Sequence, residues 1–261
     1  MEGKKSILSR ALSIVAGKSA SVTNTEGPRQ SNLAAVQQAV EKSTAIVTAA
    51  AENNRKGICF VIDATGSRQH SWEEAQKIQA SMFEALKATE NMNIGIICHR
   101  GQQVEHLGWF NNADSAKNAM RKIDCVGGNT RIVASLQKAL DGRERTPSSV
   151  MLVGDAFEED IEQLSKAVAV LKSKGVKVYA FLEGNDPAAE QAFRLAARVT
   201  DGVFKKFGDR LDGSLTDLCV AAAVFDTGGK PAFDRLLAAG HAGAKLLASD
   251  VKRLSGPKPG R

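Results

Sequence analysis

A short oxygen-rich stretch follows an apolar segment of the chain. Residues 58–67 read ICFVIDATGS, so Asp63, Thr65 and Ser67 stand at alternating positions after five apolar residues. In open α/β sheets, ligands bind in the crevice beyond the carboxyl ends of the strands, where these oxygens are expected to point. One carboxylate and two hydroxyls suit Mg²⁺ or Mn²⁺ better than zinc or copper. The alternative is a strand-to-helix turn that only caps the next helix.

Two further polar loops are predicted at the same edge of the sheet. Thr130 ends a GGNT sequence that opens a predicted helix, and Asp155 directly follows the apolar run at 150–153. In the usual winding, the strands that precede Asp63 and Asp155 are immediate neighbours. Three loops would then deliver only carboxylate and hydroxyl oxygens to one point. The predicted metal ligands are Asp63, Thr65, Ser67, Thr130 and Asp155.

Alternating strands and helices position these loops. Strands are predicted at 58–62, 93–98, 103–109, 149–153, 177–181 and 203–207, and helices at 71–86, 112–122, 132–140, 158–173, 187–199 and 211–224. Too few residues separate the second and third strands for a helical crossover, so this pair should be antiparallel, with the third strand at an edge. The fold class is therefore α/β: a doubly wound, mainly parallel six-stranded sheet with one antiparallel edge strand and helices on both faces.

The length of 261 residues and the 43% hydrophobic content predict one medium domain with appendages. We divide the chain into a basic flexible N-terminal segment (1–30), an accessory helix (31–54), the α/β domain (55–225), and a C-terminal helix with a basic tail (226–261). A Thr-Gly-Gly turn is expected just after the α/β domain.

Charge and cysteine usage narrow the function classes. The net charge is +6, but both termini are basic and the residues between them are nearly neutral, so we do not expect nucleic-acid binding. The four cysteines form no CxxC pair, as expected for reduced thiols in the cytoplasm. The chain contains no run of 18 apolar residues, and Arg10 interrupts the only leader-like stretch. We therefore expect a cytoplasmic protein with no membrane span.

Several nearby residues have ordinary structural interpretations. Residues 158–160 are three acids that suit the first turn of the predicted helix, where the helix dipole favours negative charge. Thr130 could serve only as a helix N-cap, and Asp63 could serve only to hydrogen-bond its own turn. His99 and His106 flank the predicted hairpin and show no partner pattern.

The sequence resembles a known family at these motifs. The segments DATGS, GGNT and VGDA, in this order and at these separations, resemble the von Willebrand factor type A (VWA) domain over about residues 56–224, and in particular its bacterial intracellular members. The resemblance implies a metal-ion-dependent adhesion site (MIDAS). Ser67 and Thr65 would ligate the metal directly, Thr130 in the ligand-competent state, and Asp63 and Asp155 through water. The commoner motif has Ser where Thr65 stands.

The resemblance also implies a function. The domain would act as a Mg²⁺-dependent adaptor that binds a protein partner, whose Asp or Glu completes the metal's coordination, with no catalytic residues. Family members work beside ATPases or in stress-response complexes. One alternative is a metal-free scaffold that acts through its helices and tails. Another is a phosphoryl-transfer enzyme using Asp63, but Thr65 stands where such enzymes need a second Asp. We therefore expect a protein that is not an enzyme.

Overall fold

Six strands and six helices make up the described part of the chain. The computed structural model describes residues 57–66, 93–141, 145–207 and 213–256. The segment 1–30, the accessory helix at 31–54, the helix predicted at 71–86 and Ser67 lie outside these residues. The elements in chain order are β1 (Gly57–Asp63), β2 (Asn93–Arg100), β3 (Gln103–Phe110), α4 (Ala113–Met120), α5 (Ile132–Lys138), β4 (Ser149–Gly154), α6 (Ile161–Ser173), β5 (Lys177–Glu183), α7 (Pro187–Val199), β6 (Val203–Phe207), α8 (Gly213–Ala238) and α9 (Ala242–Ser255).

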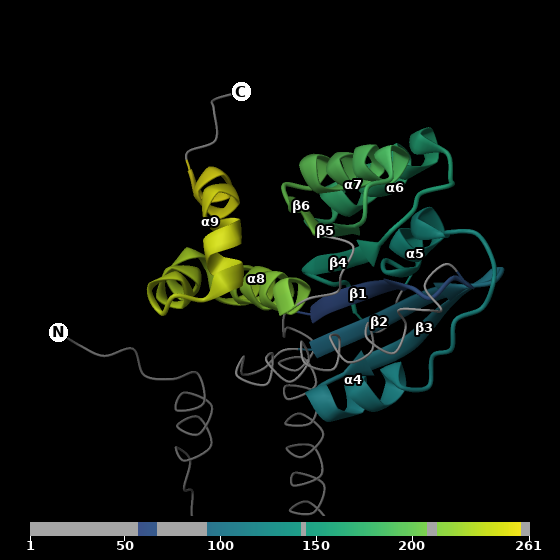
Figure 1. Cartoon of the computed structure of the whole chain (residues 1–261), viewed down its shortest axis with the longest axis horizontal. Helices are drawn as coiled ribbons and strands as arrows, with labels where there is room; N and C mark the ends of the chain where they lie inside the picture. Colours follow the sequence, from purple (N-terminus) through teal and green to yellow (C-terminus); the bar gives the residue numbers. More distant parts are fainter. Residues whose placement is uncertain (1–56, 67–92, 142–144, 208–212, 257–261) are drawn as a thin grey trace, which may run out of the picture. The chain divides into compact units, whose positions relative to one another are not determined.

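The six strands form one sheet in the order β3-β2-β1-β4-β5-β6. All neighbouring strands are parallel except β2 and β3, which form an antiparallel pair at one edge. The predicted α/β class and the antiparallel edge strand are therefore confirmed. After β2 and β3 extend the sheet on one side of β1, the chain returns to place β4 on its other side (Figure 1). The switch point of the topology lies between β1 and β4.

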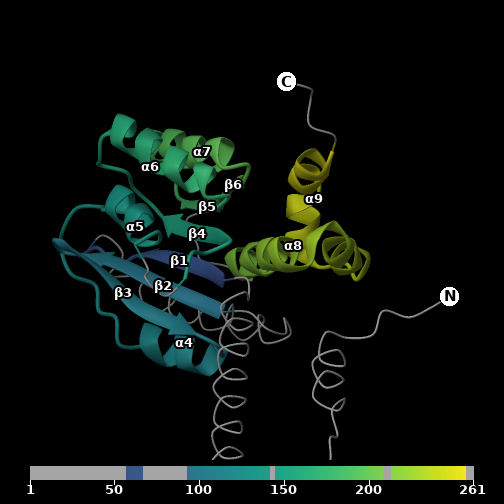
Figure 2. The same ribbon diagram turned by 180° about the vertical axis from the view of Figure 1, so that it is seen from behind.

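The central strands are buried on both faces, as a sheet covered by helices requires. In β1, Ile58, Phe60 and Ile62 pack in a cluster with residues of α4, α8 and α9. The alternate residues Cys59 and Val61 belong to a second cluster with residues of α5, α6 and α7. Figures 1 and 2 show α4 and the pair α6 and α7 on opposite faces of the sheet. This two-sided burial explains the unbroken apolar runs that precede the predicted ligands.

Helix α6 begins later than the sequence predicts. Its N-cap is Asp160, whose side chain accepts a hydrogen bond from the backbone N–H of Glu162 at 2.6 Å. Glu158 and Glu159 therefore precede the helix, and their interpretation as first-turn residues is wrong. Glu158 contacts Thr130 in the loop before α5, and Glu159 contacts Val133 in the first turn of α5.

The expected turn near residue 227 is a kink inside α8. This element continues past Phe225 and is interrupted at Gly229, whose φ of 66° and ψ of −167° are not helical. Beyond the kink, Phe233 and, from α9, Leu247 and Val251 are buried in the same core cluster as Ile58, Phe60 and Ile62 of β1. Among the described helices, none combines the length and apolar character that crossing a bilayer requires.

Candidate functional site

The rim at the carboxyl ends of β1 and β4 brings two predicted ligands close together. Ile62 of β1 pairs with Val153 of β4 in parallel register, so Asp63 lies beside Gly154, the residue that precedes Asp155. A Cβ atom added at Gly154 would lie 3.9 Å from Oδ2 of Asp63. Asp155 itself is partly buried. The two carboxylates therefore follow neighbouring strands at the switch point, where ligands of this architecture bind.

Asp63 is buried, and its two carboxylate oxygens differ in environment. Oδ1 accepts a hydrogen bond from the backbone N–H of Thr65 at 2.8 Å, so the expected turn contact is present. Oδ2 is inaccessible to solvent and has no hydrogen-bond partner among the described residues. An unpaired buried carboxylate oxygen is costly, and a cation or a bound water would satisfy it.

The charge state of Asp63 follows from its burial and from two neighbouring residues. Burial alone would raise the pKa of its carboxyl, but the hydrogen bond and charge of His99, together with the hydrogen bonds from Thr65, outweigh it and lower the pKa to about 2. Asp63 is therefore ionised at neutral pH. A buried carboxylate with one free oxygen is an available ligand for a hard cation.

His99 is the site residue that sequence reasoning missed. It is fully buried on β2, where the parallel register pairs it with Asp63 of β1. Its Nε2 lies 3.5 Å from Oδ1 of Asp63, and its Nδ1 lies 3.2 Å from Oγ of Ser135 on α5. The available signal was its position: His99 directly follows an apolar strand segment, as Asp63 does.

Thr65 is buried against the loop that leads to Thr130. It forms an isolated parallel bridge with Val126, whose backbone N–H donates to the carbonyl of Ala64 at 3.1 Å. A Cβ atom added at Gly66 would lie 3.1 Å from Cα of Gly127, so the DATGS turn and the glycine loop are in close contact. The first two predicted motifs therefore share one rim, while Ser67 lies outside the described residues.

Thr130 is buried and bonded across the rim to the loop after Asp155. Its Oγ1 accepts a hydrogen bond from the backbone N–H of Glu158, and its own N–H donates to the Glu158 carboxylate, both at 3.1 Å. The N-cap position of α5 belongs to Arg131, which makes no capping side-chain bond, so the N-cap interpretation of Thr130 is wrong. The reciprocal bonds connect the second and third motifs.

Glu159 supplies a carboxyl acceptor at the start of α5. Both of its carboxylate oxygens accept from the backbone N–H of Val133, at 3.2 and 3.1 Å. Burial raises the pKa of Glu159, although hydrogen bonds from Val133 and Ile132 oppose the shift. The first N–H groups of this helix therefore already have an acceptor from the chain itself and do not need an external anion.

The arrangement offers oxygen ligands of low total charge. Among the described residues, no group of three or more His, Cys, Asp or Glu side chains is arranged to hold a metal. The described residues bring two carboxylates and two threonine hydroxyls to this rim, and a set in which half of the donors are hydroxyls falls outside that kind of group. Such a set fits Mg²⁺ or Mn²⁺ and does not fit a His/Cys zinc centre.

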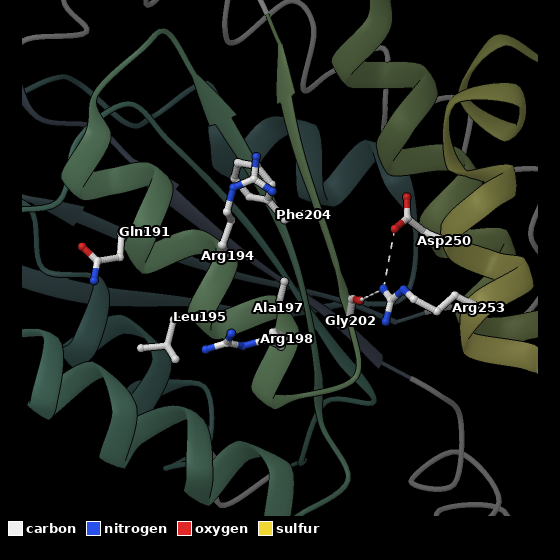
Figure 3. A pocket seen from close by; sticks show the side chains of 9 residues that line it. All are labelled: Gln191, Arg194, Leu195, Ala197, Arg198, Gly202, Phe204, Asp250 and Arg253. Atoms are coloured by element: carbon white, nitrogen blue, oxygen red, sulfur yellow. Dashed lines mark hydrogen bonds and ion pairs between the residues drawn. The ribbon is translucent and has the colours of Figure 1, made fainter. Parts of the chain in front are cut away.

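A cavity of about 640 Å³ at the β6 edge has the opposite chemistry. Arg194, Arg198 and Arg253 line it (Figure 3). The Arg194 guanidinium lies 4.3 Å from the ring centroid of Phe204, and Arg253 donates to the carbonyl of Gly202 at 3.4 Å. Three guanidinium groups repel a cation, so this cavity is not a candidate for the metal.

Comparison with known proteins identifies a domain that contains this rim. A family model of the von Willebrand factor type A domain matches residues 57–210. Among curated proteins, no significant match is found.

Solved structures share the fold at low sequence identity. BatB from Bacteroides thetaiotaomicron superposes with a TM-score of 0.55 at 13% identity, covering 66% of this chain and 99% of that one. The SpRpn10 VWA domain gives 0.52 at 13% identity, covering 62% and 94%. Proximal thread matrix protein 1 from the mussel byssus, in a structure with a zinc-occupied MIDAS motif, gives 0.54 at 15% identity, covering 65% and 46%. At these identities the likeness concerns the fold.

Proposed function

Because the chain belongs to the von Willebrand factor type A family, we propose that it is a protein-binding module with a divalent cation, Mg²⁺ or Mn²⁺, at the rim described above. The residues that would hold the cation are Asp63, Thr65, Ser67, Thr130 and Asp155. All five offer oxygen atoms, which is the donor type that these hard cations prefer. The proposal includes no turnover, so the module is not an enzyme.

The observation that carries this proposal is the free oxygen of Asp63. Oδ2 is buried without a hydrogen-bond partner among the described residues, and it faces Gly154, beside Asp155. Folding leaves such an acceptor unpaired only at a cost of about 1–3 kcal/mol. A cation, or a water bound to one, would remove that cost.

Recognition of a partner follows from the low charge of the ligands. When bound, the cation would act as an electrophilic centre whose charge the two carboxylates and the hydroxyls only partly balance. An Asp or Glu from the partner would complete the coordination. The role of this chain's residues is to hold the cation and to leave that position accessible.

We propose that the partner belongs to an intracellular bacterial complex, such as one containing an ATPase or serving a stress response. The four cysteines, Cys59, Cys98, Cys125 and Cys219, are free thiols, which supports residence in a reducing compartment such as the cytoplasm.

Mg²⁺ calorimetry and a pull-down from the native host test this proposal. The full chain should bind Mg²⁺, and Asp63→Ala should abolish the binding heat. As a matched control, Asp141→Ala removes an exposed acid after α5 and should bind as the wild type does. The pull-down should recover the partner with Mg²⁺ and lose it in EDTA or with Asp63→Ala. If capture is the same in EDTA, the metal-bridged function is wrong, and a metal-free scaffold explains the binding.

A further inference from the structure

We propose that His99 is a positioning residue for Asp63 and that Ser135 connects this pair to helix α5. The inference rests on the proposed function, because it concerns how the chain prepares Asp63 for a cation. No motif of the sequence points to His99, and its partner pattern becomes visible only when β1 and β2 are paired.

All three side chains in these contacts are buried, so each contact matters for stability. The side chains of His99 and Ser135 are fully buried, and Asp63 is 1% exposed. Polar groups at such depth need partners within the protein, because water does not replace a lost contact. Asp63 on β1, His99 on β2 and Ser135 on α5 lie in contact one after another, and together they form a polar path through the core.

The direction of the hydrogen bonds follows from the acceptors. Oγ of Ser135 lies 2.8 Å from the carbonyl oxygen of Arg131 and donates to it, because a carbonyl can only accept. The hydroxyl has no second proton to give, so Nδ1–H of His99 is the donor in their 3.2 Å contact. This contact sets the orientation of the imidazole ring and leaves Nε2 3.5 Å from Oδ1 of Asp63, an ion-pair distance at which Nε2 donates when the ring carries its second proton.

The orientation of the Asp63 carboxylate follows. The backbone N–H of Thr65 and the ring of His99 both approach Oδ1. With Oδ1 engaged on the β2 side, Oδ2 is directed to the β4 side, towards Gly154 and the adjacent Asp155. The carboxylate is thus already oriented before a cation arrives, and binding does not have to order it. Partners that orient a ligand in this way typically contribute 10–100-fold to metal affinity.

The path also connects Asp63 to the element that follows the Thr130 loop. Ser135 lies one turn into α5, a helix that begins at Ile132, two residues after Thr130. A change at Asp63 therefore reaches α5 through two side chains. The Thr130 loop and Asp63 would respond together when a cation binds.

A purely structural role would predict a different result. If His99 only fills the core, its loss would lower stability without changing Mg²⁺ affinity in the molecules that remain folded. The test therefore measures the affinity for Mg²⁺ and the nuclear magnetic resonance signals of His99 and α5. Folding is checked separately by circular dichroism.

The experiment uses the full chain at one fixed pH with four variants. His99→Leu removes both polar contacts, and His99→Gln retains a donor that can reach Asp63. Ser135→Ala removes the connection to α5. Its control is Ser149→Ala, because Ser149 is also a fully buried serine but lies on β4 opposite Ile58, at the other end of β1 from Asp63. We expect His99→Leu to weaken Mg²⁺ binding by about 10–100-fold. His99→Gln should recover most of the affinity, and Ser149→Ala should leave it unchanged. Wild-type affinity in folded His99→Leu would overturn the proposal.

Nuclear magnetic resonance of the metal-free protein tests the connection without any cation. Asp63→Asn should shift the ring nitrogen signals of His99 and the amide signals of α5, and Ser135→Ala should remove the α5 response. If Asp63→Asn leaves both sets of signals unchanged, the path does not exist. If these shifts occur but the wild type binds no Mg²⁺, the proposed function fails while the coupling stands. Should His99→Leu not fold, His99→Gln and Ser135→Ala decide the outcome.

Discussion

Side chains at the rim act in pairs that join different elements. Asp63 of β1 faces His99 of β2, and Thr130 exchanges two hydrogen bonds with Glu158, which follows β4. Glu159, one residue further, binds the first turn of α5. Each contact joins segments that are far apart in the sequence, so the ligand oxygens are supported from outside their own turns.

Glu159→Ala should lower the free energy of unfolding by about 1 kcal/mol, because α5 would lose the acceptor at its N-terminus. Burial raises the pKa of Glu159, so the folded state binds its proton more tightly than the unfolded state does. The stability that Glu159 contributes is therefore greatest below its unfolded pKa and falls as the pH rises through the folded value. Urea unfolding at pH 4 and pH 7 should show the larger loss at pH 4.

Glu159→Gln is the control for charge. Its amide oxygen can still accept from Val133, so it should lose less stability than Glu159→Ala at each pH. Neither variant has the titrating carboxyl, so the difference in stability between the two should be the same at pH 4 and pH 7. An equal loss for both variants would indicate that packing of the side chain, and not the hydrogen bond, is what matters.

The residues that the sequence could not assign depend on contacts across the sheet. Asp63 and Asp155 were accessible to prediction because each directly follows an apolar run, and the rule for open sheets places them at one rim. His99 also follows an apolar run, but nothing in the sequence pairs it with Asp63, and the position of Glu158 suggests a helix start. Their roles depend on the register of β1 with β2 and on the path of the loop before α6, and neither follows from hydrophobic periodicity.

Up to α7, the described strands and helices match the predicted segments, with differences at their ends, whereas the single helix expected in residues 226–261 is the second half of α8 followed by a separate α9. Acids at 158–159 suggest a helix start by charge alone, but the first helical residue is set by Asp160, which caps α6. A Thr-Gly-Gly sequence suggests a turn, yet only Gly229 leaves the helical conformation. Long-range packing of Phe233 keeps both halves of α8 on the core.

The kink in α8 gives a prediction about that element. Gly229 has positive φ with an extended ψ, a combination that side chains other than glycine avoid. Gly229→Ala should therefore reduce the free energy of unfolding by about 1–3 kcal/mol, measured by thermal or urea denaturation. The control is Gly127→Ala, where an added Cβ meets nothing within 4 Å. A neutral Gly229→Ala would mean that α8 can straighten without losing its packing.

The whole molecule protects most of its thiols. Burial raises the pKa of Cys59 and of Cys98 to about 12, and it also raises the pKa of the buried Cys219. These thiols are therefore protonated and inaccessible at pH 8, whereas Cys125 is partly exposed. We expect one thiol to react rapidly with a disulfide reagent in the native protein and four in denaturant. Rapid reaction of two or more in the native state would show that the core opens easily.

The two edges of the sheet bear on how the protein behaves at high concentration. Unpaired edge strands can recruit strands from other molecules, and this is one origin of aggregation. Strand β6 is only five residues long, and its Lys205 and Lys206 pair with Asp250 and Glu190. At the opposite edge, the register of β3 shifts beside Gly108. This irregularity interrupts the evenly spaced backbone groups that another strand would pair with. Both edges therefore resist strand addition, so crowding should not drive intermolecular sheet formation through them.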